Sequence, residues 1–250
     1  MNKIINNDCL EAMKDIEDNS IDMVLCDLPY GTTQNKWDIV IPLEPLWEQY
    51  KRVCKENAAI LLFSQTPFDK VLGCSNLEML RYEWIWIKSK ATGHYNCRKM
   101  PLKKHENILV FYKKLPTYNP QMAIGKPYIN NTKPFIQGSN YGVNKKYNFY
   151  VNKGTRFPNS ILIFDSINTN KQLHPTQKPL ALCEYFIKTY TDEQEVILDN
   201  CIGSGTTAIA AINTNRKYIG IEKDKKYYDM AVQRIKECNE EMEDMFSTHI

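Results

Sequence analysis

The sequence predicts an α/β fold in which a mostly parallel sheet carries helices on both faces. Short apolar runs at 21–26, 58–63 and 196–198 have the length and composition of buried strands. Segments with apolar residues at helical spacing separate most of these runs, and alternation of strand and helix is typical of parallel sheets. An aspartate follows the runs at 21–26 and 196–198, which places carboxylates at the edge where open α/β sheets bind ligands.

The N-terminal half contains a regular series of expected elements. Leu10, Met13 and Ile16 are spaced like one face of a helix, and Pro45 suits the first turn of another. The other apolar runs are bounded by polar or turn-forming residues and predict strands. In order, we expect strand 3–6, a helix ending near 18–20, strand 21–26, a polar loop at 31–41, helix 45–56, strand 58–63, helix 67–72 and strands 82–87 and 107–112.

The composition changes between 113 and 172, where Pro, Asn, Tyr and Lys dominate and apolar periodicity is weak. We expect little regular structure there, and its Tyr and Phe residues favour an insertion on the core domain over a linker. The α/β pattern then returns. We expect a helix through Leu182 and Phe186, strand 196–198, a glycine turn at 203–207, helix 208–213, strand 218–221, helix 226–240 and a tail that frays.

The composition of the whole chain fits one sizeable domain with an insertion, or two small domains. It has 250 residues, of which 43% are hydrophobic. Since no apolar run reaches the length of a signal peptide or a membrane span, we expect neither. The eight cysteines are scattered without a Cys-x-x-Cys pair, which predicts reduced thiols in a cytoplasmic protein and no metal site.

Charge is distributed unevenly along the chain. Between Arg81 and Arg156 fifteen lysines and arginines face only Glu83 and Glu106, so this segment carries about +13 in a chain whose net charge is +3. We expect a polyanionic partner for this basic segment rather than neutralisation by the acidic remainder.

The stretch Asp27-Leu28-Pro29-Tyr30 follows the strand at 21–26. Pro29 ends the strand and stiffens the turn, so a carboxylate, a free backbone carbonyl and an aromatic ring are presented together at the sheet edge. An ordinary Asp/Pro turn is the alternative for these four residues alone.

A second pattern lies late in the chain, where a strand ending at Asp199 leads into Gly203-Ser204-Gly205-Thr206 and a later strand ends at Glu222. This is the layout of a nucleotide-binding βαβ unit, although a plain turn would also explain the glycines. Gly-x-Gly-x-x-Gly and Gly-Lys-Thr are absent, which argues against a dinucleotide or ATP. Glu222 can accept hydrogen bonds from ribose hydroxyls, and Asp199 suits an ammonium group. S-adenosylmethionine combines both features.

These motifs resemble the β group of the DNA amino-methyltransferases, which methylate the exocyclic nitrogen of adenine or cytosine. Asp27–Tyr30 is similar to the catalytic motif, Leu198–Thr207 to the cofactor motif, and His174–Pro179 to the segment beside the methionine end of the cofactor. Ile219–Glu222 is similar to the ribose-binding strand, and Asn7–Cys9 to the opening motif near the adenine. The five motifs occur in the order that this group shows.

The resemblance implies a permuted Rossmann-like methyltransferase fold with a seven-stranded sheet, in which the N-terminal strand lies beyond the strand that ends at Glu222. Residues 1–112 would form the catalytic half, 113–171 a target-recognition insertion, 172–240 the cofactor-binding half and 241–250 a tail. The implied partner is double-stranded DNA, whose target base is flipped out, and we allow for a homodimer. The implied catalytic residues are Asp27, Leu28, Pro29 and Tyr30, and the implied S-adenosylmethionine-binding residues are Asp8, Cys9, Asp27, His174, Pro175, Thr176, Lys178, Asp199, Gly203, Ser204, Gly205, Thr206 and Glu222.

The chain departs from the family pattern in two places, with Leu28 where Pro is usual and Asn200-Cys201 where Pro-Phe is usual. The aspartate that begins the catalytic motif, in place of Ser, favours adenine N6 over cytosine N4 by resemblance. RNA as the substrate, a non-catalytic nucleic-acid-binding protein and a small-molecule oxidoreductase are the alternatives. An intact Asp27 and Tyr30 argue against the second, and the missing dinucleotide pattern argues against the third.

Overall fold

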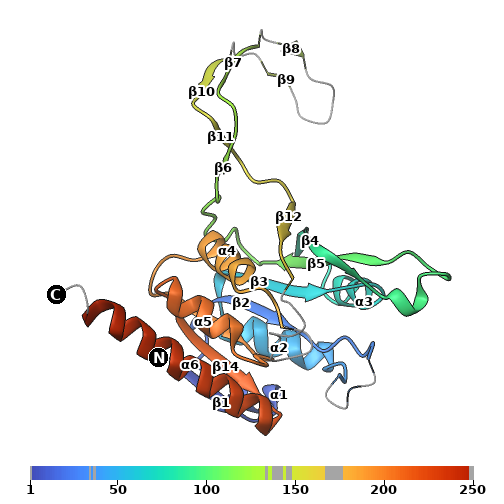
Figure 1. Cartoon of the computed structure of the whole chain (residues 1–250), viewed down its shortest axis with the longest axis vertical. Coiled ribbons are helices and arrows are strands. Elements are labelled where there is room, and N and C mark those ends of the chain that lie inside the picture. Colours follow the sequence, from blue (N-terminus) through green and yellow to red (C-terminus); the bar gives the residue numbers. More distant parts are fainter. Residues whose placement is uncertain are drawn as a thin grey trace. The chain divides into compact units, whose positions relative to one another are not determined.

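The computed structural model describes residues 2–33, 35, 38–132, 135–136, 143–144, 148–166 and 177–247. The chain divides into two compact units (Figure 1). Met1–Asn119 and Ser160–Ile250 form the first, here called the core unit, and Pro120–Asn159 form the second, here called the insertion unit.

One mixed sheet organises the core unit. Among the described residues it has eight strands, in the order β1 (Lys3–Asn6), β14 (Lys217–Glu222), β13 (Val196–Asp199), β2 (Ile21–Asp27), β3 (Cys54–Ser64), β5 (Lys103–Phe111), β4 (Leu80–Thr92) and β12 (Ile161–Phe164). Only β5 runs antiparallel to its neighbours. The mostly parallel sheet is therefore confirmed, and so is the place of the N-terminal strand, because β1 pairs with β14.

The prediction of seven strands was wrong by one. The additional strand is β12, which pairs in parallel with β4 at the edge of the sheet, Leu162 opposite Trp86. It lies inside the stretch 113–172, where little regular structure was expected. Its four residues give too short a pattern to be recognised after the Pro- and Asn-rich sequence before it.

Helices cover both faces of the sheet (Figure 1). Successive residues of a strand point to opposite faces, so Val24 and Cys26 pack on one side and Met23 and Leu25 on the other. The first cluster includes residues of α1 (Cys9–Met13), α2 (Leu43–Val53) and α3 (Phe68–Cys74). The second includes residues of α4 (Leu180–Tyr190), α5 (Thr206–Asn213) and α6 (Lys225–Ser247). The central strand β2 is thus buried on both faces, as its continuous apolar sequence predicts.

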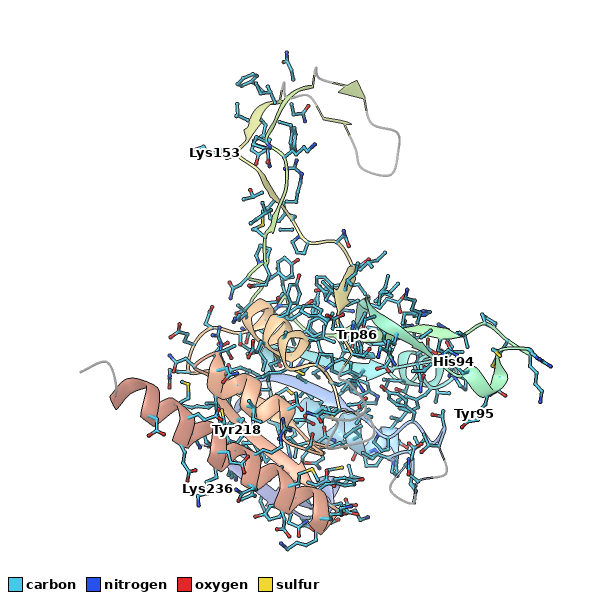
Figure 2. The ribbon with its side chains drawn as sticks, viewed as in Figure 1. Trp86, His94, Tyr95, Lys153, Tyr218 and Lys236 are labelled. Atoms are coloured by element: carbon cyan, nitrogen blue, oxygen red, sulfur yellow. The ribbon has the colours of Figure 1, made fainter. Side chains whose placement is uncertain are left out.

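The antiparallel pair β4 and β5 forms a hairpin whose two ends have different surroundings. Trp84 and Trp86 of β4 are buried and pack within the core. Figure 2 labels Trp86 within the core unit and shows His94 and Tyr95 at the far end of the hairpin. The 3₁₀ turn His94–Asn96 lies in the connection between the two strands.

Helix α6 is longer than predicted, since it continues past 240 to Ser247. Ion pairs at i, i+4 join Lys225 to Asp229 and Lys236 to Glu240 along its surface. Such pairs support a helix on its exposed side, where apolar periodicity gives no signal. The tail expected from 241 is therefore helical as far as Ser247.

The insertion unit contains more regular structure than its composition predicted. A ribbon pairs β7 (Tyr128–Thr132) antiparallel with β10 (Asn148–Asn152), and shorter pairs join β6 (Ala123–Ile124) to β11 (Thr155–Arg156) and β8 (Phe135–Ile136) to β9 (Val143–Asn144). Backbone hydrogen bonds stabilise such a ribbon whatever its side chains are. Asn-rich strands therefore form without the apolar periodicity by which strands are predicted from sequence.

Candidate active site

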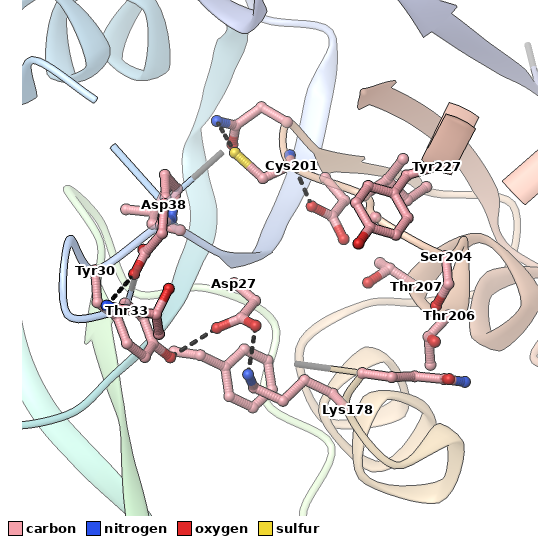
Figure 3. A pocket seen from close by; sticks show the side chains of 18 of the residues that line it. Asp27, Tyr30, Thr33, Asp38, Lys178, Cys201, Ser204, Thr206, Thr207 and Tyr227 are labelled. Carbon is pink, nitrogen blue, oxygen red and sulfur yellow. Dashed lines mark hydrogen bonds and ion pairs between the residues drawn. The ribbon is translucent and has the colours of Figure 1, made fainter. Parts of the chain in front are cut away.

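A cavity of about 1030 Å³ lies where β2, β13 and β14 end. Residues from 1–112 and from 172–240 both line it, among them Tyr30 and Gly203. Figure 3 shows Tyr30, Asp27 and Ser204 among the lining residues. His174, Pro175 and Thr176 lie outside the described residues. Gly205 is not part of the lining. The other predicted site residues all line the cavity: Asp8, Cys9, Asp27, Leu28, Pro29, Tyr30, Lys178, Asp199, Gly203, Ser204, Thr206 and Glu222.

Asp27 ends strand β2, and both oxygens of its carboxylate accept hydrogen bonds. The Tyr30 hydroxyl donates to Oδ1 at 2.6 Å, and the Lys178 ammonium donates to Oδ2 (Figure 3). Burial raises the pKa of Asp27, and the charge of Glu106 adds to that rise while Lys178 opposes it. The carboxylate is thus held in place and is a better proton acceptor than an exposed aspartate.

Lys178 connects Asp27 to a further buried carboxylate. Its Nζ lies 3.4 Å from Glu106 Oε2, and Lys88 pairs with the other oxygen of Glu106. Burial alone would lower the pKa of Lys178, but the two carboxylates outweigh it and raise that pKa. Lys178 and Lys88 likewise outweigh burial at Glu106 and lower its pKa. Positive and negative charges thus alternate among four residues that line the cavity, in the order Asp27, Lys178, Glu106 and Lys88.

Sequence reasoning missed Glu106 and Lys88 and assigned Lys178 to the cofactor. In the structure Lys178 lines the cavity and pairs with the carboxylate of Asp27. One signal was available, because Glu106 is the only acid between Lys88 and Arg156 and begins the apolar part of β5. An isolated acid in a basic stretch that enters a buried strand indicates an internal ion pair.

Aromatic rings surround the exposed side of the Asp27 carboxylate. Tyr30 stacks on Phe68 with centroids 5.3 Å apart and an interplanar angle of 25°. The Lys178 ammonium lies 5.1 Å from the centroid of Phe63, which also lines the cavity. Leu28 buries its side chain in the core. A flat, apolar slot next to a hydrogen-bond acceptor suits a planar heterocycle that carries an amine.

Asp38 orders the loop that follows the catalytic motif. Its carboxylate accepts hydrogen bonds from the backbone N–H groups of Gly31, Thr32 and Thr33 at 2.8, 2.9 and 2.6 Å. Burial would raise its pKa, but these bonds together with the Thr33 side chain lower it. Asp38 was not among the predicted residues, since a carboxylate that binds backbone groups leaves no residue pattern beyond a loop aspartate.

The glycine turn after β13 combines a buried carboxylate with a tightly packed backbone. The Cys201 N–H donates to Asp199 Oδ1 at 3.1 Å, and burial raises the pKa of Asp199 to about 6. Gly205 has φ +84°, and a Cβ there would lie 3.2 Å from the Cβ of Ala231 in α6. Gly205 therefore lets the chain enter α5 close against α6, which aims the turn at the cavity.

Glu222 holds the other end of the predicted cofactor region. Its carboxylate accepts hydrogen bonds from the N–H groups of Gly203 at 2.9 Å and Asp224 at 2.8 Å. Burial raises the pKa of Glu222, and these bonds partly oppose the rise. Asp8 lies on the same side, where it caps Leu10 N at 3.0 Å and pairs with Lys223 at 3.1 Å. Two carboxylates thus flank the space in which a ribose and a base would lie.

These residues fit S-adenosylmethionine. The Thr206 hydroxyl is buried at the start of α5 and has no hydrogen-bond partner among the described residues, so it is available to a ligand. Asp199 can accept from an ammonium group and Glu222 from ribose hydroxyls. Tyr227 of α6 and Cys201 also line the cavity (Figure 3).

All eight cysteines are free thiols, and burial raises the pKa of Cys26, the cysteine beside Asp27, to about 12. Within the described ranges, no group of His, Cys, Asp and Glu is arranged to hold a metal ion. The same part of the chain contains no helix long and apolar enough to cross a membrane.

Part of the charge of the basic segment is balanced inside the core unit, against our expectation. Lys113 and Lys114 both pair with Glu56, and Lys88 pairs with Glu106. In the insertion unit, the Arg156 guanidinium binds Asn152 and lies 4.5 Å from the ring centroid of Tyr128. These cations have internal roles, so fewer than fifteen are available to a polyanion.

Comparison with known proteins identifies the family. A family model described as DNA methylase matches residues 21–233. The chain is 29% identical to the type II methyltransferase M.HpaI of Haemophilus parainfluenzae, over 93% of this chain and 74% of that protein. It is also 29% identical to the DNA adenine methyltransferase YhdJ of Escherichia coli, over 93% of this chain and 82% of that protein.

The fold agrees with a solved structure of a cofactor complex. The crystal structure of the M1.HpyAVI–SAM complex superposes with a TM-score of 0.64 at 24% identity, covering 94% of this chain and all of that one. The family match spans the catalytic motif and the cofactor motif in their observed order. This chain therefore belongs to the β group of the DNA amino-methyltransferases, enzymes that use S-adenosylmethionine to methylate adenine N6 or cytosine N4.

Proposed function

We propose that this methyltransferase transfers its methyl group to N6 of adenine at specific sites in double-stranded DNA. The observation that carries the proposal is the Asp27 carboxylate, fixed by Tyr30 and Lys178 beside an aromatic slot and across the cavity from Asp199 and Glu222. The aspartate that begins the catalytic motif supports adenine, as does similarity to a relative named as a DNA adenine methyltransferase.

Asp27 acts on the amine. An exocyclic amine is a weak nucleophile because its lone pair is delocalised into the ring. Hydrogen bonds from the amine to the Asp27 carboxylate and to the Leu28 carbonyl oxygen favour the tetrahedral geometry that frees this pair. The nitrogen gains a methyl group and loses one proton, which the Asp27 carboxylate can accept because burial raises its pKa.

Lys178 is a positioning residue. Both oxygens of Asp27 already accept hydrogen bonds, so an incoming amine competes with these donors for the carboxylate. Lys178 has an alternative partner, since Glu106 Oε2 is 3.4 Å from its Nζ and has no hydrogen bond of its own within the described residues. We infer that Lys178 moves towards Glu106 when the base enters, which keeps its charge compensated.

The cofactor, when bound, supplies an electrophilic methyl group. The chain contributes position, which provides much of the rate when the reagent is already reactive. Asp199, Thr206 and Glu222 would hold the amino acid and ribose parts. Tyr30 would stack on the base, and the base must leave the duplex to reach it.

The insertion unit is proposed to contact the target sequence. Exposed apolar and aromatic side chains such as Ile129, 66% exposed, and Phe149, 63% exposed, lie on its β7–β10 ribbon. Two-stranded ribbons of this kind fit the major groove, where base edges differ most.

The product identifies the base. DNA free of methylation is incubated with S-adenosylmethionine and the enzyme, digested, and analysed by mass spectrometry, with Asp27→Ala as the inactive control. We expect N6-methyladenine in the wild-type reaction only. If N4-methylcytosine were the sole product, the assignment of the base would be overturned while the role of Asp27 would stand.

A further inference from the structure

The β4–β5 hairpin ends in an ordered tip, residues 93–102. Gly93 adopts φ +89° and starts the 3₁₀ turn His94–Asn96. Backbone hydrogen bonds from Lys99 N and Met100 N to the Asn96 carbonyl, at 2.8 and 3.0 Å, close a second turn. The tip is therefore a folded structure that presents particular side chains in a defined way.

Tyr95 is the most exposed aromatic residue in the part of the chain that the structure describes, with a relative exposure of 105%. Its ring makes no stacking contact with another described residue, and Figure 2 shows Tyr95 at the far end of the β4–β5 hairpin. Met100 and Leu102, also at the tip, are 52% and 37% exposed. Three exposed apolar side chains on one ten-residue tip indicate a binding surface.

The surroundings of Tyr95 are strongly basic. No acidic residue occurs between Lys88 and His105, a stretch that contains six lysines and arginines. Five of them have no ion-pair partner within the described ranges: Lys90, Arg98, Lys99, Lys103 and Lys104, of which Lys103 hydrogen-bonds to Gln65. The tip therefore combines unpaired cations with a protruding aromatic ring, which is the combination that nucleic-acid strands bind.

The same hairpin leads into the active site. Lys88, Lys90, Ala91 and Thr92 line the cavity that contains Asp27, and Thr92 directly precedes the tip. Tyr95 thus follows a residue of the cavity lining by only three positions, which puts the tip on the hairpin that a duplex bound at the cavity would contact.

We propose that Tyr95 enters the duplex and fills the space that the target base leaves when it is flipped into the cavity. Arg98 and Lys99 bind the flanking phosphates. Flipping costs the stacking and pairing of the target base, and an inserted ring replaces part of that stacking. The inference rests on the proposed function, since it requires duplex DNA as the substrate.

The target sequence is first mapped in DNA that the wild-type enzyme has methylated. The test then compares two duplexes that contain this sequence. In one the target base is paired, and in the other it faces an abasic position, so that little pairing has to be broken. We expect Tyr95→Ala to lower kcat/KM about tenfold or more on the paired duplex and to have little effect on the abasic one. Tyr95→Phe keeps the ring and should behave like wild type on both.

Two further variants separate stacking from charge. The double variant Arg98→Ala, Lys99→Ala should weaken the binding of both duplexes equally, because phosphate contacts do not depend on whether the target base is paired. An equal loss on both duplexes for Tyr95→Ala, or no loss, would overturn the role of Tyr95. Since Tyr95 is fully exposed, its variants should melt at the wild-type temperature. If the wild-type enzyme itself methylated no duplex DNA, the proposed function would fail first, and this inference with it.

Discussion

Lys178 forms a buried ion pair with Asp27, although the two residues are 151 positions apart in the sequence. The pair joins the end of β2 to the segment before α4, so the carboxylate proposed to act on the amine is positioned by a residue from the C-terminal part of the chain. Glu106 offers Lys178 a second partner at 3.4 Å. The relationship makes Asp27 both fixed in the free enzyme and accessible to an amine that can compete with the ammonium group.

Replacing Asp27 should separate catalysis from cofactor binding. Asp27→Ala removes the acceptor of the amine hydrogen bonds and should abolish methyl transfer, while S-adenosylmethionine affinity measured by calorimetry stays close to wild type. Asp27→Asn should also be severely impaired, because its amide is uncharged and can present an NH₂ group to the amine. Loss of cofactor binding in Asp27→Ala would show that the carboxylate has a different role.

Replacing Lys178 should move the pH profile of methyl transfer. Transfer requires ionised Asp27, so activity falls as the pH decreases through the pKa of Asp27. Burial already raises that pKa, and Lys178 opposes the rise. In Lys178→Met the opposition is removed, and the acid limb should move to higher pH by about 1–3 units, the usual effect of a neighbouring charge.

Glu106→Gln provides the matched partner for this experiment. Because Glu106 adds to the rise in the pKa of Asp27, neutralising it in the Lys178→Met background should move the acid limb part of the way back. Glu106→Gln also removes the buried charge of Glu106, which has lost Lys178 as a partner in this background. The double variant should therefore fold more stably than Lys178→Met alone. A merely structural role of Lys178 would lower the rate equally at all pH values, and an unshifted profile would therefore contradict its positioning role.

Cofactor affinity should depend on the ionisation of Asp199. Burial raises the pKa of Asp199 from 3.8 to about 6 in the free protein. The free-energy cost of ionising the buried carboxyl group therefore grows as the pH rises from 3.8 to 6, and it stays constant above pH 6. This cost is about 3 kcal/mol, and it destabilises the free fold at neutral pH. A ligand ammonium group favours the ionised form, so S-adenosylmethionine affinity should weaken as pH falls through about 6, by up to about tenfold per unit.

5′-Methylthioadenosine is the control ligand, because it contains the nucleoside part but no ammonium group. Its affinity should change much less over the same pH range, which isolates Asp199 from Glu222. Asp199→Asn should bind S-adenosylmethionine weakly and without this pH dependence, while melting at a higher temperature than wild type above pH 6. Parallel pH profiles for the two ligands would exclude Asp199 as the ammonium partner.

Gly93 and Gly205 have similar positive φ angles, so alanine at each position separates backbone strain from the steric clash of a Cβ with its neighbours. Gly205 has φ +84° and a Cβ there would meet Ala231, whereas Gly93 has φ +89° and nothing within 4 Å. Gly93→Ala should cost only the torsional term, about 1–2 kcal/mol. Gly205→Ala should cost more in urea unfolding and should also weaken cofactor binding, since it displaces the start of α5. Equal costs for both would mean that contact with α6 does not position the turn.

Positions that a local pattern determines were predictable from the sequence. Asp27 and Asp199 follow apolar strands directly, so the rule for strand ends placed them at one edge. Gly203 and Gly205 were recognisable because a tight turn before a helix requires glycine torsions. The parallel arrangement followed from the alternation of strands and helices.

Features that depend on distant packing were not predictable. Glu106 and Lys88 acquire their roles only when β4 and β5 pair and Lys178 lies above them. Strand β12 exists because the edge of β4 is free to accept it, and four residues cannot reveal that edge. Asp38 binds backbone groups, whose positions the side-chain sequence does not encode.

The salt dependence of DNA binding should report which cations face the phosphates. Log affinity falls with log salt concentration by roughly 0.9 per phosphate contact. Lys113 and Lys114 pair with Glu56, whereas Arg98 and Lys99 are unpaired among the described residues. Replacing Arg98 and Lys99 with alanine should therefore lower the slope by about one to two units, and replacing Lys113 and Lys114 should leave it unchanged.

Binding is measured across a salt series on one duplex, with cofactor affinity as the control for folding. A flat wild-type line would mean that phosphates contribute little. An equal change in both double mutants would show that the Glu56 pairs open on DNA, so that sequence position rather than pairing decides which cations contact the strand.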